Sequence, residues 1–112
     1  MLKPSVLAIA AAFVLAACAT AAGPSPQSLK VTLRQLRTGA GLDSFAGNMA
    51  MEYRLGGRIV RTHDFQEGVR AVIVDKDNAP KWSPADLSGV SDAELDRLFA
   101  PLPSDEEWTS LA

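Results

Sequence analysis

Apolar and polar residues recur with helical spacing in the first clearly patterned stretch of the chain, residues 25–41. One face of this stretch is apolar, at intervals of four and three residues: Leu29, Leu33 and Leu36. A second face is basic, at the same intervals: Lys30, Arg34 and Arg37. Ser25 followed by Pro26 is typical of a helix N-cap and first helical position, whereas Gly39 and Gly41 are typical of a helix end. We therefore expect an amphipathic helix whose leucine face needs a covering partner.

A second helix is predicted to begin at Asp43, which can act as its N-cap, and to run to about Thr62. Its apolar positions continue past residue 56: Leu42, Phe45, Met49, Tyr53, Ile59 and Val60. The adjacent Gly56 and Gly57 predict a break, because each glycine costs about 1 kcal/mol relative to alanine inside a helix. Three residues of this stretch are interpreted as core rather than ligand-binding residues: Met49, Met51 and Tyr53.

A third helix is predicted from Asp64, with Glu67 three positions later as the second member of a capping box. Its apolar face repeats with helical spacing: Phe65, Val69, Val72 and Ile73. Residues 75–79 form a polar stretch that predicts a turn. Residues 80–84 contain two prolines, which favour an extended, restricted backbone.

The last predicted helix has the clearest local signals. Ser91 and Glu94 form a capping box, and Val90 with Leu95 forms a hydrophobic staple across it. The apolar face is narrow: Leu95, Leu98 and Phe99. Pro101 ends the helix, and residues 101–112 are expected to form a loose acidic tail apart from Trp108. No alternating stretch is long enough to predict a strand, so the sequence predicts an all-α fold.

The first 24 residues have a different pattern from the rest. After one positive charge, residues 6–17 are an uninterrupted apolar run of the length of a signal-peptide h-region, too short for a comfortable membrane span. The run ends in Leu-Ala-Ala-Cys, which resembles a lipobox with Cys18 as the lipidation candidate. Three interpretations remain open: a lipoprotein signal and tether, an Ala-rich buried helix that belongs to the helical body, or a truncated coding region. The predicted organisation is therefore residues 1–24, a helical module at 25–100, and the acidic tail at 101–112.

Charge and residue counts narrow the possible chemistry. The net charge is −2, so nothing suggests a nucleic-acid partner. Residues 25–74 carry seven bases and four acids, whereas residues 75–112 carry three bases and nine acids. This basic middle is interpreted either as a surface for an anionic ligand or as solvated helix faces. A single cysteine excludes an internal disulfide, and the solitary His63 cannot form a metal site by itself.

Three blocks of the sequence point to a family. They are SPQSLKVTLRQL at residues 25–36, MEYRL at residues 51–55 and DFQEGVRAVIVDKDNAPKWSP at residues 64–84. In this order they resemble the C-terminal portion of 3-hydroxyisobutyryl-CoA hydrolases, a branch of the crotonase (enoyl-CoA hydratase/isomerase) superfamily. The resemblance implies a short, hairpin-like array of helices that corresponds to the C-terminal helices of a crotonase-like enzyme, preceded by a hydrophobic N-terminal helix.

The resemblance also implies what this chain lacks. The family hydrolyses a CoA thioester, in valine catabolism, with an oxyanion hole and a carboxylate that lie upstream of the matched segment. No catalytic residue therefore maps onto this chain, no cofactor or metal is expected, and the chain alone is not expected to turn over substrate. In crotonase-like enzymes the C-terminal helices pack over the acyl-CoA pocket, so by resemblance the CoA-binding candidates are Lys76, Lys81 and Trp82. The structural alternative is that Trp82 fills a gap between helices and that the lysines are solvated.

Two functional hypotheses follow. The first is a C-terminal fragment of an acyl-CoA thioesterase, cytoplasmic by resemblance, whose partner is the missing crotonase core or a second copy bound through exposed helix faces. The second is a small lipid-anchored envelope protein that uses the helical module for structure or interaction.

Overall fold

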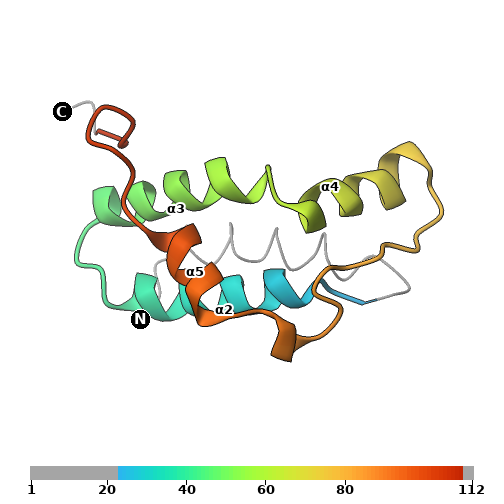
Figure 1. The fold of residues 1–112 in the computed structure, drawn as a ribbon. Coiled ribbons are helices and arrows are strands. Elements are labelled where there is room, and N and C mark those ends of the chain that lie inside the picture. The colour runs from blue at the N-terminus through green and yellow to red at the C-terminus, as the bar shows by residue number, and fades with distance from the viewer. Residues whose placement is uncertain (1–22, 110–112) are drawn as a thin grey trace.

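The computed structural model describes residues 23–109, and all regular secondary structure in that range is helical (Figure 1). The elements in chain order are α2 (Pro26–Ala40), α3 (Phe45–Ile59), α4 (His63–Val69), the π-helix η1 (Arg70–Val74), the 3-10 helix η2 (Leu87–Gly89) and α5 (Asp92–Phe99). The all-α prediction is confirmed for this range. The predictions on the hydrophobic N-terminal segment and on Cys18 lie outside the described residues.

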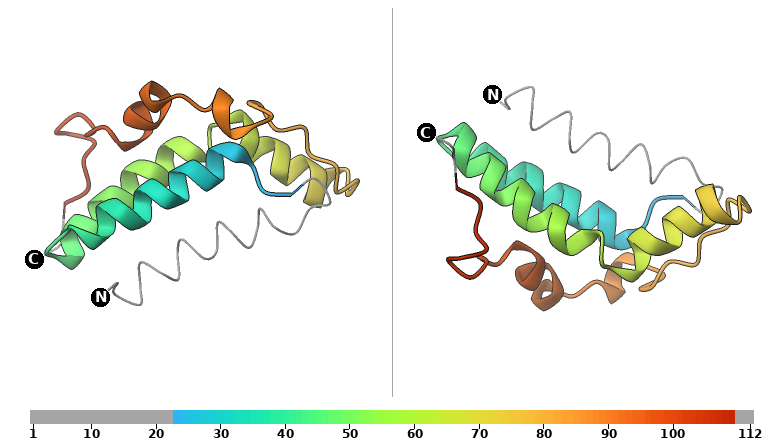
Figure 2. Two further views of the ribbon diagram at one scale, coloured as in Figure 1. Left: turned by 90° about the horizontal axis from the view of Figure 1, so that it is seen from below. Right: turned by 90° about the horizontal axis from the view of Figure 1, so that it is seen from above.

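Helices α2 and α3 run antiparallel as a hairpin, and α5 lies across one face of it (Figure 2). The hydrophobic core is formed where these three helices and the segment before α5 meet: Val31, Met51, Leu55, Val90, Leu95 and Leu98. Helix α4 and η1 extend beyond the end of α3, away from this core (Figure 1). The chain then returns along α4 toward the start of α2 before it reaches α5 (Figure 1).

Helix α2 begins as predicted but buries a different face. The Ser25 side chain accepts a hydrogen bond from the Ser28 N–H, and Gly41 is the C-cap. The buried positions toward the hairpin repeat every four residues: Gln27, Val31, Gln35 and Gly39. Leu29 and Leu33 remain 38% and 49% exposed. The buried glutamines are compatible with this interface because their amides donate to Glu94 and Glu52, respectively.

Helix α3 corrects two predictions. Its N-cap is Ser44 rather than Asp43, and the Ser44 side chain accepts from the Gly47 N–H. The predicted break at Gly56 and Gly57 is wrong, because the helix continues through both to Ile59. Tertiary contacts on both sides of the two glycines outweigh the propensity cost. Leu55 is buried in the core, and Arg58 donates to the backbone carbonyls of Leu98 and Ala100 at the end of α5.

The core assignment for α3 is correct in part. Met51 is 5% exposed and belongs to the core, and Met49 is half-buried. Tyr53, by contrast, is 51% exposed, because it lies on the helix face that turns away from α2 and α5. An apolar stripe read from spacing alone therefore includes a residue that the packing leaves in solvent.

The start of α4 also differs from the prediction. The N-cap is Thr62, whose side chain accepts from the Phe65 N–H, so Asp64 lies inside the first turn. Asp64 is 4% exposed, and its carboxylate accepts from the Ser25 hydroxyl at 2.5 Å and from the Ser83 N–H at 2.8 Å. The capping-box prediction failed because these tertiary partners, 39 and 19 residues away, engage the carboxylate that would otherwise cap the helix.

Helix α5 forms as the local signals predict. The Ser91 side chain accepts from the Glu94 N–H, and both members of the staple, Val90 and Leu95, are buried. The Glu94 carboxylate accepts from Gln27 at 2.8 Å, which joins the starts of α5 and α2. The segment after α5 is anchored at Glu107, contrary to the prediction of a loose tail, because Arg54 Nε of α3 donates to both oxygens of the Glu107 carboxylate, at 2.8 and 3.0 Å.

Candidate functional site

The residues predicted to bind CoA lie in the segment that follows η1. We call residues 75–79 the Lys76 loop. Two of its non-glycine residues have left-handed backbone, with φ of 54° at Lys76 and 52° at Asn78. Such a conformation costs roughly 1–2 kcal/mol for most residues, and less for asparagine. The wide π turn supports the loop from its base, because the Asp75 N–H donates to the Arg70 carbonyl at 2.8 Å and the Asn78 N–H to the Ala71 carbonyl at 2.9 Å.

The Arg70 guanidinium holds the Lys76 loop against α4. It donates to both oxygens of Glu67, at 2.9 Å from Nε and 2.7 Å from Nη2. It also donates to Asp75 and Asp77, each at 2.8 Å. The fork of arginine matches a carboxylate with two parallel hydrogen bonds, which makes such a contact geometrically specific. One side chain therefore connects the helix before the loop with both acidic residues inside it.

These contacts set the protonation of the carboxylates. The hydrogen bonds from Arg70, followed by the backbone N–H of Lys81, lower the pKa of Glu67 to about 2. The hydrogen bond from Arg70 also lowers the pKa of Asp77, with a smaller contribution from the Ala79 N–H. Glu67 is therefore ionised across the physiological range. A general acid/base needs a pKa nearer to neutrality, so Glu67 is assigned a structural role.

Lys81 and Trp82 lie on the return segment beside α4. The Lys81 N–H donates to Glu67 Oε1 at 3.0 Å, and the Lys81 carbonyl is 3.1 Å from His63 Nε2. The Trp82 indole N–H donates to the Gly23 carbonyl at 3.1 Å. The same indole lies against Gly68, where an added Cβ would be 3.5 Å from the ring. Trp82 thus fills the space between α4 and the start of α2.

The three candidate residues lie on one short segment of the chain, residues 76–82. The side chains of Lys76 and Lys81 are exposed, and Trp82 is half-buried. Glu67 connects the Lys76 loop with Lys81, because its carboxylate accepts from the Lys81 N–H and from Arg70, which holds the loop. Binding of CoA by these residues stays a prediction. Sequence reasoning missed Arg70, whose only signal was the number of acids within seven residues of it.

Most bases of residues 25–74 have partners inside the chain. Arg34 pairs with Asp96 at 2.7 Å and stacks over Phe99, with its guanidinium carbon 4.8 Å from the ring centre. The others with internal partners are Lys30, Arg54, Arg58 and Arg70. The basic middle of the sequence is therefore neither a continuous anion-binding surface nor simply a set of solvated helix faces. Five of its seven bases connect helices or loops.

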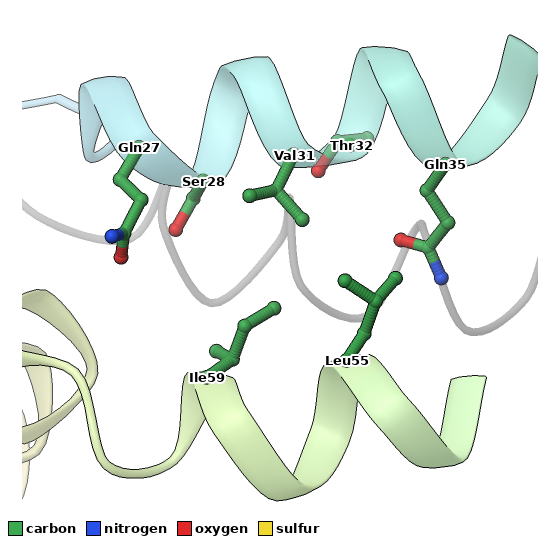
Figure 3. Close-up of a pocket in the computed structure, with 7 residues that line it drawn as sticks. All are labelled: Gln27, Ser28, Val31, Thr32, Gln35, Leu55 and Ile59. Carbon is green, nitrogen blue, oxygen red and sulfur yellow. The ribbon is translucent and has the colours of Figure 1, made fainter. Parts of the chain in front are cut away.

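A small groove lies between α2 and α3 (Figure 3). Seven residues line it: Gln27, Ser28, Val31, Thr32, Gln35, Leu55 and Ile59. Its water-accessible volume is about 10 Å³, close to the minimum that holds one water molecule. The groove is therefore too small for an acyl-CoA, and the Lys76 loop remains the better candidate site.

Within residues 23–109, no three His, Cys, Asp or Glu side chains are arranged to hold a metal ion. Among the helices of that part of the chain, none has both the length and the apolar character that crossing a membrane requires.

Comparison with known proteins identifies relatives of the chain. A sequence model described as enoyl-CoA hydratase/isomerase matches residues 5–99. The mitochondrial 3-hydroxyisobutyryl-CoA hydrolase of Gallus gallus is 56% identical over 78 residues, which are 70% of this chain and 20% of that protein. The human enzyme of the same name is 50% identical over 82 residues, 73% of this chain and 21% of that protein. The Danio rerio enzyme is 48% identical over 91 residues, 81% of this chain and 24% of that protein.

Solved structures agree with these relatives. An enoyl-CoA hydratase from Rhodobacter sphaeroides 2.4.1 superposes with a TM-score of 0.68 at 35% identity, covering 78% of this chain and 26% of that one. A carnitinyl-CoA dehydratase from Mycobacterium thermoresistibile gives 0.66 at 40% identity, covering 74% of this chain and 23% of that one. The chain thus spans between 20% and 24% of the three curated relatives described above.

The family match also bears on the first residues of the sequence. It begins at residue 5 and includes the apolar run and Cys18. The relatives described above give no support to a lipoprotein signal, and the prediction of a helix in this segment lies outside the described residues. With the family model matching residues 5–99 and the fold matching crotonase-type structures, the chain belongs to the enoyl-CoA hydratase/isomerase family.

Proposed function

We propose that this chain acts as the C-terminal helical module of a 3-hydroxyisobutyryl-CoA hydrolase-like acyl-CoA thioesterase, with the catalytic core supplied by residues outside these 112. One observation carries the proposal. Curated relatives with 48–56% identity all bear the name of this hydrolase, and the match occupies only 20–24% of each. A module of this kind contributes packing and ligand contacts to an enzyme and needs the core for chemistry.

Exposed apolar surfaces support a larger partner. Leu33 of α2 is 49% exposed, and three consecutive residues at the far end of the molecule, Val72, Ile73 and Val74, are 38%, 64% and 68% exposed. Contiguous exposed apolar residues mark interaction surfaces in soluble proteins. We take the crotonase core as the partner for these faces, and a second copy of this chain as the competing occupant.

The Lys76 loop is the proposed contribution to acyl-CoA binding. Lys76 and Lys81 are exposed cations on a segment that the Glu67–Arg70 pair attaches to α4. Exposed ammonium groups on a held backbone are suited to the phosphates of CoA. In the same proposal Trp82 contributes the flat surface that packs beside the ligand.

A split-enzyme experiment tests this function. The human relative is truncated at the residue that aligns with the start of this chain, and the truncated core is mixed with the 112-residue chain. We expect negligible hydrolysis of 3-hydroxyisobutyryl-CoA by either part alone and a clear gain of activity from the mixture. The double variant Lys76→Ala, Lys81→Ala should raise the KM of the mixture more than it lowers kcat.

Two results would count against the proposal. Turnover by the isolated chain would show that it carries catalytic groups of its own. A mixture that forms no complex in size-exclusion chromatography and gains no activity would show that the exposed faces serve another partner, and a dimer of the chain in the same column would identify that partner as a second copy.

A further inference from the structure

Arg70 differs from the other internally paired arginines in the number of carboxylates that it contacts. Arg54 and Arg34 each contact one carboxylate, on Glu107 and Asp96. Arg70 contacts three, on Glu67, Asp75 and Asp77. It further donates to the Ala79 carbonyl at 3.5 Å, the last residue of the Lys76 loop. A single guanidinium therefore reaches from the helix to the far end of the loop.

The conformation of the loop depends on this guanidinium. Three carboxylates around one point repel one another unless a cation lies between them. Lys76 and Asn78 also have left-handed backbone, a conformation that a short polar loop does not maintain without supporting contacts. Apart from the backbone bonds from η1, the side-chain contacts that support the loop converge on Arg70, directly or through the Asp77 carboxylate, which also accepts from the Ala79 N–H at 2.9 Å.

The backbone of the second lysine, Lys81, is also connected to Arg70, through the Glu67 carboxylate. Glu67 Oε1 accepts from Arg70 Nη2 at 2.7 Å and from the Lys81 N–H at 3.0 Å. The orientation of the Glu67 carboxylate thus sets the position of the backbone at Lys81. Through one side chain, Arg70 influences both of the exposed lysines that flank residues 77–80.

We propose that Arg70 is a positioning residue, whose forked contacts hold the Lys76 loop in its left-handed conformation and so orient Lys76 toward an organic phosphate ligand. The orientation toward CoA rests on the function proposed above, whereas control of the loop does not. Arg70 acts without touching the ligand, because its donors are directed to Glu67, Asp75, Asp77 and Ala79.

The charge-conserving substitution Arg70→Lys separates geometry from charge. A lysine keeps one positive charge near the loop, so general attraction for a phosphate is retained. It cannot form the fork that contacts Glu67 with two donors while reaching both aspartates. The matched control is Arg54→Lys, which removes a contact outside the loop in which Nε and Nη2 of Arg54 each lie 2.8 Å from a Glu107 carboxylate oxygen.

The experiment uses the full chain with two measurements. Order in the loop is measured as the rate of cleavage after Lys76 by a lysine-specific protease, and ligand binding by titration calorimetry with CoA and with adenosine 3′,5′-bisphosphate. Circular dichroism confirms that each variant keeps its helices. For Arg70→Lys we expect cleavage about tenfold faster and CoA binding about tenfold weaker, a change equivalent to about 1.4 kcal/mol. Arg54→Lys should change neither measurement.

A double-variant cycle distinguishes positioning from direct contact. If Arg70 acts through Lys76, the variant Arg70→Lys, Lys76→Ala should bind CoA about as weakly as Lys76→Ala alone, because the two effects are then not additive. Additive losses would mean that Arg70 acts other than through Lys76, by its own contact with the ligand or through Lys81, and would overturn the positioning of Lys76. Unchanged cleavage in Arg70→Lys would overturn control of the loop. If the wild-type chain binds neither ligand while Arg70→Lys is cleaved faster, control of the loop stands and the proposed CoA contact is wrong.

Discussion

Two regions of the molecule are held together by different kinds of interaction. The first region, the hairpin half, comprises α2, α3, α5 and the residues that lead into α5, and it contains the hydrophobic core: Val31, Met51, Leu55, Val90, Leu95 and Leu98. The second region, the loop half, comprises α4, η1 and residues 75–84 and contains none of these core residues. It is held by polar contacts. The Asp64 carboxylate contacts Ser25 and Ser83, and Arg70 contacts three carboxylates.

The difference separates stability from candidate function. Burial of apolar area depends little on pH or salt. A contact between charges, by contrast, weakens as the salt concentration rises or as one of its groups loses its charge. The loop half carries the exposed lysines and the left-handed backbone, so its conformation depends on groups that titrate. We therefore expect changes in the hairpin half to affect global unfolding and changes in the loop half to affect local order and ligand binding.

The largest effect should come from the centre of the core. Leu98 is 1% exposed, so Leu98→Ala removes buried methyl groups and leaves a cavity, at a cost of about 2–5 kcal/mol in the free energy of unfolding. Urea denaturation followed by circular dichroism measures this change. Leu33→Ala is the control, because Leu33 is 49% exposed and its loss should change stability by at most about 0.5 kcal/mol. Similar losses for both would contradict the placement of the core.

A substitution at Asp64 tests the polar contacts that connect the two regions. Asp64→Asn keeps the shape but leaves one of the two contacts, to the Ser25 hydroxyl or the Ser83 N–H, without a good acceptor, so we expect a loss of about 1–3 kcal/mol. Thermal unfolding measures it, with Asp105→Asn in the exposed tail as a control. A loss of stability no larger than that of the control would show that the buried carboxylate is not needed to connect the two regions.

Gly57 tests the continuity of α3 in the hairpin half. No atom lies within 4 Å of a Cβ added at this position, and the residue is exposed within a continuous helix. Gly57→Ala should therefore stabilise the chain by up to about 1 kcal/mol through helix propensity. The measurement is the midpoint of urea unfolding. A decrease in stability would mean that the helix bends at Gly56 and Gly57 in solution.

Acid should loosen the loop half first. The pKa of Glu67 is lowered to about 2 in the folded chain, from an ordinary value of 4.5. Its contribution to stability is therefore present above about pH 4.5 and is lost as the pH falls toward about 2. Trp82 lies against Gly68, so its fluorescence in a Trp108→Phe background reports the loop half. The Glu67→Gln variant should lose this acid dependence, and an identical acid transition in that variant would assign it to another group.

The smallest expected effect has the opposite sign and lies in the hairpin half. Burial raises the pKa of Glu52, and the hydrogen bond from Gln35 opposes this shift. A raised carboxyl pKa contributes stability below the ordinary value of about 4.5, and this contribution is lost as the pH rises through the folded-state pKa. Glu52→Gln should therefore make unfolding of the hairpin half less dependent on pH above about 4.5, as measured by circular dichroism at several pH values. Unchanged pH dependence would contradict this assignment.

Local signals predicted the helices well and their contacts poorly. The caps at Ser25 and Ser91 and the staple of Val90 with Leu95 form as expected, because each involves residues within five positions of one another. The cap at Asp64 failed because its carboxylate has tertiary partners. The candidate site was predicted only as a segment, since the lysines and Trp82 were found by resemblance and Arg70 was not found.

The sequence by itself determined that residues 23–109 are helical, where α2 and α5 begin, and that the chain resembles the C-terminal part of 3-hydroxyisobutyryl-CoA hydrolases. Helical periodicity, capping and matched blocks can all be read along the chain. Only the tertiary structure decided which face of α2 is buried, that Asp64 joins distant segments, and that Arg70 holds the Lys76 loop. The physical reason is the range of the interactions. Helix caps join residues that are close in the sequence. Gln27, by contrast, donates to Glu94, which is 67 positions away, and such a contact depends on how the helices pack.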